Sequence, residues 1–180
     1  GVGKSMLAKA IANEAGVPFY GLSASFLIGS MKGEGSNRIR SIYTQARKSP
    51  AAIVFIDEID SIAGTVTDVG SSRTDELNQI LVELDGIGRS NVVTIGATNM
   101  EEKLDPAFFR SGRFDRKVYV GLPDKDARAL IFAKYLKEIK LEAEPDLQKL
   151  AKLSVNFSGA DIAATCNEAA ILAVRNARKV

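Results

Sequence analysis

Two hydrophobic spacings alternate along the first two thirds of the chain. Continuous apolar runs are typical of strands buried on both faces, and they occur in AAIVFID, NVVTIGATN and KVYVGLP, with a shorter run at residues 17–22. Apolar residues that recur every three or four positions predict helices at residues 7–15, 36–48 and 73–86. Strands that alternate with helices favour an α/β fold with a parallel sheet and helices on both faces.

The pattern changes after Pro123, where apolar strand-like runs stop. Three helical segments follow at residues 126–138, 145–153 and 160–179, and Ser158 and Asp161 have the spacing of a capping box before the last one. We therefore expect an α/β body at residues 1–122 and a small all-helical domain at residues 123–180. Clusters of small residues predict irregular loops at 29–35 and 64–72.

Composition narrows the chemistry. The 180 residues are 46% hydrophobic and 26% charged, with a net charge of +2, so neither nucleic acid nor an anionic membrane is expected as the main partner. A single cysteine, Cys166, forms no intramolecular disulfide and favours a reducing compartment. No apolar run reaches the length of a membrane span, and no signal peptide is expected.

The chain contains no histidine. This excludes an H-E-x-x-H zinc site, a Ser-His-Asp triad and a Cys-His dyad within these residues. Chemistry here must use carboxylates, arginines, lysines, hydroxyls, amides and a bound ion. Phosphoryl transfer suits that set, because it depends on positioning and charge more than on covalent catalysis.

The first five residues, GVGKS, raise the possibility of a phosphate site. Gly3, Lys4 and Ser5 match the last part of the loop signature G-x-x-x-x-G-K-[ST] and directly precede a predicted helix. Backbone N–H groups and the helix dipole favour an anion there. Lys4 would reach the outer phosphates, and the Ser5 hydroxyl would bind Mg²⁺. The alternative is a frayed terminus with a lysine, and this motif alone leaves both open.

A second motif, IVFIDEID, decides between them. Asp57 and Glu58 follow a buried strand at its carboxyl end, where open α/β sheets place their ligands. Asp57 can hold Mg²⁺ through water, and Glu58 can polarise an attacking water. Solvated acids are also common at strand ends, but pairing with the G-K-S helix start favours a nucleotide site. Residues 1–5 are then the last part of a Walker A loop.

Two further motifs fit the same site. Asn99 ends the next apolar run and can orient the attacking water or contact the γ-phosphate, although asparagine also forms turns at strand ends. Arg110 and Arg113 lie three residues apart, either as a solvated surface pair or as donors to a phosphate. We expect them to act on a neighbouring subunit's phosphate, an effect worth about 10³–10⁵ in rate, which requires a ring of subunits.

The motifs GVGKS, IVFIDEID, IGATN, LDPAFFRSGRFDR and FSGAD occur in the order of the AAA family of ring ATPases, and the resemblance covers essentially the whole chain. It implies a RecA-like P-loop NTPase core with a helical lid, ATP or ADP with Mg²⁺ as ligands, and a homo-hexamer. In that family Asp57 and Glu58 match Walker B, Asn99 matches sensor 1, and Arg110 and Arg113 match the arginine fingers.

The resemblance also implies further positions. Nucleotide-contacting residues would be Gly1, Val2, Gly3, Lys4, Ser5, Met6, Asp57, Gly159 and Ala160, the last two in a lid motif near the adenine. Asp60, Asp85 and Gly86 match positions that relay nucleotide state between subunits. Met31, Lys32 and Gly33 match a pore loop that grips polypeptide.

Within the family, TDELNQILVELDGI and GADIAATCNEAAILAVRNAR are most similar to the FtsH branch of membrane-anchored AAA proteases. That resemblance implies membrane helices and a zinc protease domain outside these residues, on the cytoplasmic side of a bacterial inner membrane or an organelle equivalent. Soluble double-ring unfoldases related to valosin-containing protein, in the cytoplasm, are the alternative. Met31 stands where FtsH usually has an aromatic residue, and Ile87 stands where its D-G-F motif has phenylalanine.

Three functions follow from these motifs. The first is an ATP-driven motor that unfolds and threads polypeptide, and the second is a nucleotide-gated assembly module, which the departures Met31 and Ile87 keep open. The third, a helicase or clamp loader, is disfavoured by the Arg110/Arg113 spacing, the SGAD lid motif and the lack of a basic stripe. We also expect that the strand before the P-loop, the first P-loop glycine and the last lid helix lie outside the sequence.

Overall fold

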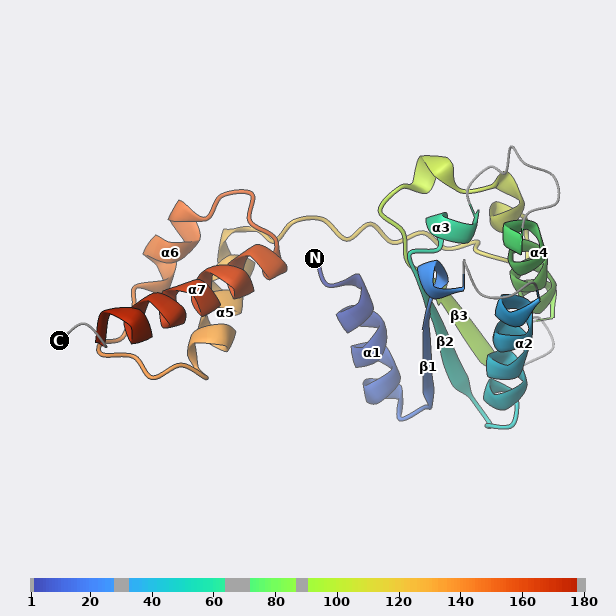
Figure 1. Cartoon of the computed structure of the whole chain (residues 1–180), viewed down its shortest axis with the longest axis horizontal. Helices are drawn as coiled ribbons and strands as arrows, with labels where there is room; N and C mark the ends of the chain where they lie inside the picture. Colours follow the sequence, from blue (N-terminus) through green and yellow to red (C-terminus); the bar gives the residue numbers. More distant parts are fainter. Residues whose placement is uncertain (1, 28–32, 64–71, 87–90, 178–180) are drawn as a thin grey trace. The chain divides into compact units, whose positions relative to one another are not determined.

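The structure, a computed structural model, describes residues 2–27, 33–63, 72–86 and 91–177 (Figure 1). The chain forms two compact units, Ser5–Val118 and Tyr119–Val180, with Gly1–Lys4 grouped with the second. The expected domain boundary between residues 122 and 123 stays a prediction.

The first unit is built on a parallel sheet, as the sequence predicts. Its strands are β1 (Phe19–Ser23), β2 (Ala52–Asp57) and β3 (Val92–Gly96), in the spatial order β1-β2-β3. The strand β2 lies between the other two, and its residues from Ala52 to Ile56 are buried. Because β3 is an edge of the described sheet, Val93 remains 57% exposed, whereas the sequence predicts a strand buried on both faces.

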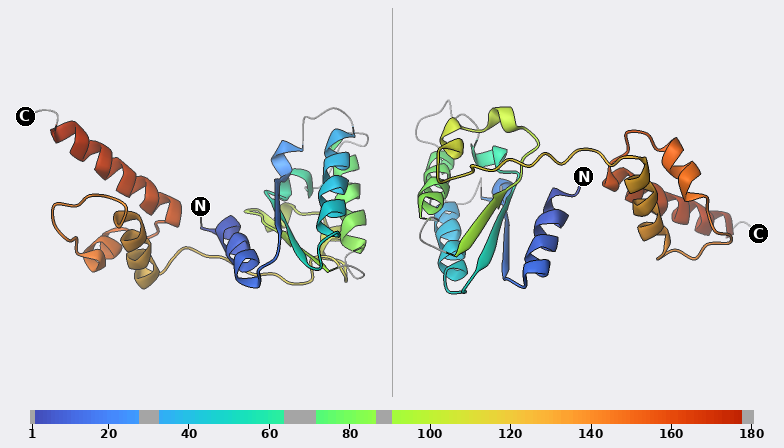
Figure 2. Two further views of the ribbon diagram at one scale, coloured as in Figure 1. Left: turned by 90° about the horizontal axis from the view of Figure 1, so that it is seen from below. Right: turned by 180° about the vertical axis from the view of Figure 1, so that it is seen from behind.

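Helices cover both faces of this sheet, which confirms the predicted layering (Figures 1 and 2). Helix α1 (Lys4–Ala15) lies on one face, where its buried Ala8 packs with Phe55 of β2. Small alanine side chains let the helix approach the sheet closely. Helices α2 (Glu34–Ala46) and α4 (Ser72–Asp85) cover the other face, where they pack with β2 in the larger core cluster of this unit.

Short elements connect these layers. Helix α3 spans Asp60–Ala63, just after β2. Single 3-10 turns span Ala24–Phe26, Glu101–Lys103 and Pro106–Phe109. They reverse the chain near the carboxyl ends of β1 and β3, where the candidate site residues occur.

The second unit is helical, with α5 (Lys125–Leu136), α6 (Leu147–Leu153) and α7 (Gly159–Ala177). Its core includes Phe132, Ile162 and Cys166. The predicted capping box is confirmed, because the Ser158 N–H donates to Asp161 Oδ2 at 2.8 Å and the Asp161 N–H donates to Ser158 Oγ at 3.3 Å. Hydrogen bonds from Ser158 lower the pKa of Asp161. Within the described ranges, none of the helices could cross a membrane.

One predicted strand is wrong. Residues 117–123, KVYVGLP, form no strand, and Val118 and Tyr119 are 80% and 94% exposed. A strand needs a neighbouring backbone for its ladder of hydrogen bonds, and among the described strands none pairs with this segment. The apolar residues of this run favour burial, but they do not by themselves supply a neighbouring strand with which to pair.

The predicted loop at 29–35 is too long at its carboxyl end. Glu34 and Gly35 already belong to the first turn of α2, and Gly33 precedes the helix with a φ of 84°. A Cβ atom on Gly35 would lie 2.6 Å from Glu76 Oε1, so the buried Glu76 side chain of α4 would have to shift to admit a larger residue here. Met31 and Lys32 of the predicted pore loop, and Ile87, lie outside the described residues.

Tyr43 gives a test of this packing. Its side chain is fully buried on α2, and its hydroxyl and Thr94 Oγ1 on β3 are 2.8 Å apart. Burial raises the pKa of Tyr43 to about 12. Because the unfolded chain ionises this phenol near pH 10 and the folded chain does not, the neutral phenol contributes stability below pH 10 that is lost as pH rises toward 12.

As pH rises toward 12, the free energy of unfolding of the wild type should fall by about 2 to 3 kcal/mol through ionisation of Tyr43. Tyr43→Phe has no phenol at this position and should not show that part of the fall. Denaturant unfolding of both proteins at pH 8, 10 and 11.5 measures the difference. Tyr119→Phe, at an exposed position, is the matched control and should leave the pH profile unchanged. Parallel pH profiles for the wild type and Tyr43→Phe would contradict the prediction.

Candidate functional site

The structure brings the two halves of the predicted nucleotide site into contact. Ser5 lies in the first turn of α1 and Asp57 is the last residue of β2, and the Ser5 hydroxyl donates to Asp57 Oδ2 at 2.6 Å. These residues are 52 positions apart in the sequence. A hydroxyl oxygen beside a carboxylate is the type of hard oxygen donor set that Mg²⁺ prefers, so this pair fits a magnesium ion held together with phosphates.

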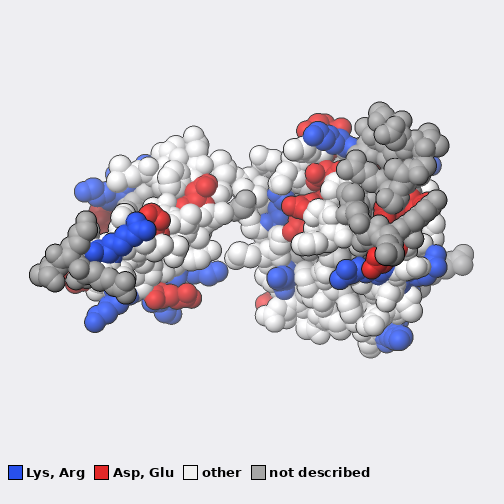
Figure 3. Space-filling view, in the orientation of Figure 1, with Lys and Arg blue, Asp and Glu red and all other residues white. Residues whose placement is uncertain are grey.

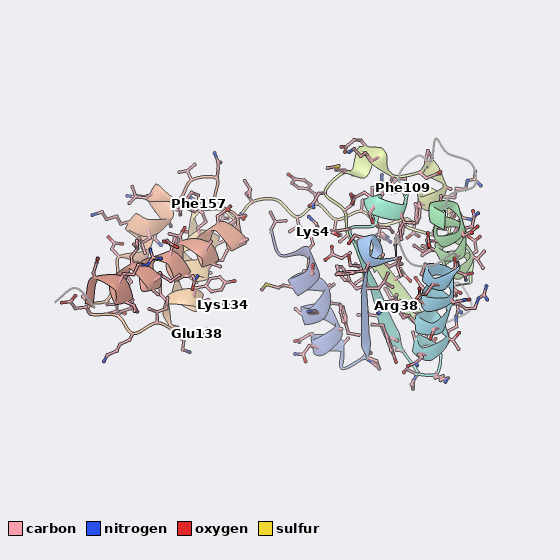
Figure 4. The ribbon with its side chains drawn as sticks, in the orientation of Figure 1. Lys4, Arg38, Phe109, Lys134, Glu138 and Phe157 are labelled. Atoms are coloured by element: carbon pink, nitrogen blue, oxygen red, sulfur yellow. The ribbon has the colours of Figure 1, made fainter. Side chains whose placement is uncertain are left out.

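The turn that enters α1 also suits an anion. Gly3 has a φ of 97°, a conformation that glycine adopts without strain, and the helix begins directly after it at Lys4. The first N–H groups of an α-helix have no partner within the helix and carry partial positive charge. Lys4, labelled in Figure 4, adds a full positive charge at this end of α1.

Glu58 takes an unusual backbone conformation directly after β2. Its φ is 53°, a left-handed value that costs roughly 1–2 kcal/mol for a residue with a Cβ atom. Its N–H donates to Asp57 Oδ1 at 3.0 Å, and Ser23 at the end of β1 donates to Glu58 Oε2 at 3.3 Å. The exposed Glu58 carboxylate therefore lies at the same carboxyl edge of the sheet as Asp57.

The segment after β3 is fixed to the segment after β2. The Ala97 N–H donates to the Ile56 carbonyl at 2.8 Å, and the Ile59 N–H donates to the Ala97 carbonyl at 3.0 Å. Thr98 Oγ1 donates to Asp60 Oδ1 at 2.6 Å. These bonds hold the start of the segment that carries Asn99, two residues beyond Ala97, at the same sheet edge as Glu58.

Two residues of this site, Ser23 and Thr98, were not predicted from the sequence. Ser23 contacts Glu58, and Thr98 contacts Asp60. Both are small hydroxyl residues near the carboxyl ends of strands in a parallel sheet, and that position is the sequence signal that could have identified them. Their partners were recognisable from motifs, whereas a lone serine or threonine was not.

Arg113 is held within its own chain. Its Nε donates to Asp85 Oδ1 at 2.6 Å, its Nη2 donates to Asp85 Oδ2 at 2.8 Å, and its Nη1 donates to the Ala107 carbonyl at 2.7 Å. This two-pronged bond lowers the pKa of Asp85 and raises that of Arg113. Arg110 is exposed, and its charge also lowers the pKa of Asp85.

The remaining predicted residues are placed as follows. Val2 is half-buried and Met6 is 58% exposed on α1. Gly159 and Ala160 are the first two residues of α7, in the helical unit. Gly33 precedes α2, while Gly1, Met31 and Lys32 lie outside the described residues. Within the described part of the first unit, Arg113 bonds to Asp85 and to the Ala107 carbonyl, and not to Ser5 or Asp57.

Surface charge is mixed on the face shown in Figure 3. Basic and acidic side chains are interspersed over each unit on this face. Proteins that bind nucleic acid usually gather Lys and Arg into a patch or stripe. The described side chains visible on this face form no such stripe.

Comparison with known proteins gives two family matches. The model of the ATPase family associated with various cellular activities (AAA) matches residues 1–122, and the AAA+ lid domain matches residues 144–180. The first match covers more than half of the chain and includes Ser5, Asp57 and Glu58.

Individual relatives are similar along almost the whole chain. An ATP-dependent zinc metalloprotease FtsH from Parabacteroides distasonis is 45% identical over 99% of this chain and 27% of the relative. The protein of that name from Nitrosococcus oceani is 47% identical over 99% of this chain and 29% of the relative. FtsH 3 from Sphaerobacter thermophilus is 49% identical over 97% of this chain. The chain thus spans 27% to 36% of the length of these relatives.

Proposed function

The chain belongs to the AAA family of ATPases and is an ATP-binding domain of that family, and from this premise we propose that it is the ATPase module of a ring-forming motor that unfolds polypeptide for an attached zinc protease. The membership confirms the predicted fold class, a P-loop core of the AAA type with a small helical lid. The observation that carries the nucleotide-site part of this proposal is the 2.6 Å bond between Ser5 and Asp57. It joins the Walker A hydroxyl to the Walker B carboxylate at one sheet edge.

We propose a separate role for each residue at this edge. Ser5 and Asp57 hold Mg²⁺, which neutralises charge on the phosphates when it is bound. Lys4 and the first N–H groups of α1 bind the phosphates. Glu58 polarises the attacking water, and Asn99 orients it. Ser23, through its bond to Glu58, helps to hold that carboxylate in place.

We propose that Arg110 and Arg113 act on the nucleotide of a neighbouring subunit in a homo-hexamer. Arg113 is bonded to Asp85 in this structure, so it must exchange that carboxylate for a phosphate to act in this way. The fixed, planar arrangement of guanidinium donors suits either partner. Asp85, at the carboxyl end of α4, then competes with the neighbour's phosphate for the same arginine.

The machinery around the module is proposed from the relatives. Their name, ATP-dependent zinc metalloprotease, indicates a zinc site in those proteins, and we propose that zinc binds in a domain outside these 180 residues. We also propose that segments outside these 180 residues attach the protein to a membrane and place this module on the cytoplasmic side of that membrane. Gly159 and Ala160 would lie near the adenine, and Met31, Lys32 and Gly33 would grip unfolded protein. An H-E-x-x-H motif in the residues that follow would test the protease assignment.

Replacing Lys4 tests the phosphate site. We expect Lys4→Ala to weaken ATP binding about 100-fold or more, because two charge-assisted hydrogen bonds to phosphate, each roughly 1.5–3 kcal/mol, are lost. The measurement is a titration of the intact protein with a fluorescent ATP analogue and Mg²⁺. Lys48→Ala, at an exposed position after α2, is the matched control. Wild-type affinity in a folded Lys4→Ala protein would overturn the assignment.

A further inference from the structure

The outer edge of β1 has unpaired backbone groups. The Ile53 N–H donates to the Pro18 carbonyl at 2.9 Å, and Tyr20 is in register with Val54. In a parallel ladder alternate residues face the partner strand, so Tyr20 faces β2 while Phe19 and Gly21 direct their N–H and C=O groups outward. Within the described chain, those outward groups have no hydrogen-bond partner.

A groove of about 550 Å³ follows this edge. Its lining comes from both faces of the sheet and includes Lys9, Phe19, Gly21, Phe26, Arg38 and Ile42. Gly21 is exposed and has no side chain to obstruct an approaching backbone, and the Phe26 ring is 79% exposed. An apolar groove along an unpaired strand edge is the geometry used for strand addition by an extended peptide.

Two cations flank the edge. Lys9 projects from α1 and Arg38, labelled in Figure 4, from α2, and these helices cover opposite faces of the sheet. Both side chains are exposed, and neither forms an ion pair with another described residue. The acid that lines the groove, Asp57, is already bonded to Ser5. Unpaired positive charge on both faces favours acidic side chains in the occupant.

We propose that the β1 edge binds an extended polypeptide segment in which acidic and apolar residues are mixed, by adding it as a fourth strand. Side chains of an added strand point alternately to the two faces, so acidic residues can reach both Lys9 and Arg38 while apolar ones contact Phe19 and Ile42. A second copy of the chain fits less well, because pairing of two β1 edges would bring like charges together. The groove shares Ser5 and Asp57 with the proposed nucleotide site, but the strand-edge proposal goes beyond ATP hydrolysis and does not rest on it.

The test measures peptide binding to the intact protein by fluorescence anisotropy. The probe is a labelled ten-residue peptide that contains glutamate and valine, and a lysine–valine peptide of equal length is its control. We expect the acidic peptide to bind at least about tenfold more tightly, and Lys9→Glu with Arg38→Glu to reverse that preference. Basal ATP hydrolysis should stay close to wild type, because neither residue takes part in the described bonds of Ser5, Asp57 or Glu58, although both line the same groove as Ser5 and Asp57.

Gly21 separates backbone pairing from charge. Gly21→Pro removes the outward N–H and should weaken the acidic peptide about tenfold, whereas Gly21→Ala keeps the N–H and should stay within about threefold of wild type. Both substitutions place a Cβ atom 3.1 Å from the Phe19 ring, so Gly21→Ala controls for that contact. If Gly21→Pro does not fold, the charge-reversal pair alone decides the outcome.

Three results would overturn the proposal. They are equal affinity for the two peptides, unchanged binding in a folded Gly21→Pro protein, and sedimentation showing self-association through β1 that Gly21→Pro abolishes. Because peptide binding is measured without ATP, any of these results leaves the ATPase assignment standing. Loss of ATP binding in Lys4→Ala would likewise not bear on the proposal for the β1 edge.

Discussion

Glu58→Gln is expected to lower ATP hydrolysis by about 10²–10⁴-fold while ATP affinity stays close to wild type. Glutamine has the same size and can adopt the same positive φ, so the Ser5–Asp57 pair that we propose to hold Mg²⁺ remains intact. Its amide cannot accept a proton from the attacking water. The protein should therefore bind ATP and retain it unhydrolysed.

Two measurements check this expectation. Single-turnover hydrolysis gives the rate of the chemical step, and rapid gel filtration shows whether bound nucleotide is ATP or ADP. Glu102→Gln, an exposed position in the turn after β3, is the matched control and should hydrolyse ATP at the wild-type rate. Turnover at the wild-type rate by a folded Glu58→Gln protein would remove Glu58 from the reaction.

Removing the two arginines should have an effect of similar or greater size. If these cations act on a neighbour's transferring phosphate, as we propose, the double substitution Arg110→Ala with Arg113→Ala should reduce hydrolysis about 10³–10⁵-fold, with ATP affinity almost unchanged. The Arg113→Ala change also leaves Asp85 without its ion pair. Lys117→Ala, which breaks the exposed ion pair with Glu101, controls for the loss of a surface cation.

Mixed rings distinguish action between subunits from action within one. An Arg113→Ala subunit keeps its own Glu58, and a Glu58→Gln subunit keeps its arginines. Rings that contain both variants should recover activity where a good Glu58 meets a good neighbouring Arg113. Absence of recovery in rings shown by mass spectrometry to be mixed would count against action in trans.

The sequence predicts those parts of the fold that depend on short-range pattern. The central strand β2 is recognisable because a continuous apolar run stops at Asp57, and α1 is recognisable because a glycine and a lysine precede its apolar positions. Their junction follows from a general property of parallel sheets, whose carboxyl ends meet at one edge. The contact between Ser5 and Asp57 was therefore foreseeable without any knowledge of distance.

Features that depend on a partner distant in the sequence were not foreseeable. The run at 117–123 lacks a neighbouring strand among the described residues, so its apolar residues remain exposed. Glycine suits position 35 in α2 because the Glu76 side chain of α4 leaves little room there for a Cβ atom. The bond between Arg113 and Asp85 joins residues 28 positions apart. Nothing in the local spacing around either residue encodes that choice of partner.

Hydrolysis of ATP by the intact protein, with and without unfolded polypeptide and double-stranded DNA, tests the central claim most directly. The account predicts Mg²⁺-dependent hydrolysis that unfolded polypeptide stimulates, that DNA leaves unchanged, and that Glu58→Gln abolishes. Hydrolysis that needs no Mg²⁺, that persists in Glu58→Gln, or that only DNA stimulates would contradict the proposed polypeptide motor.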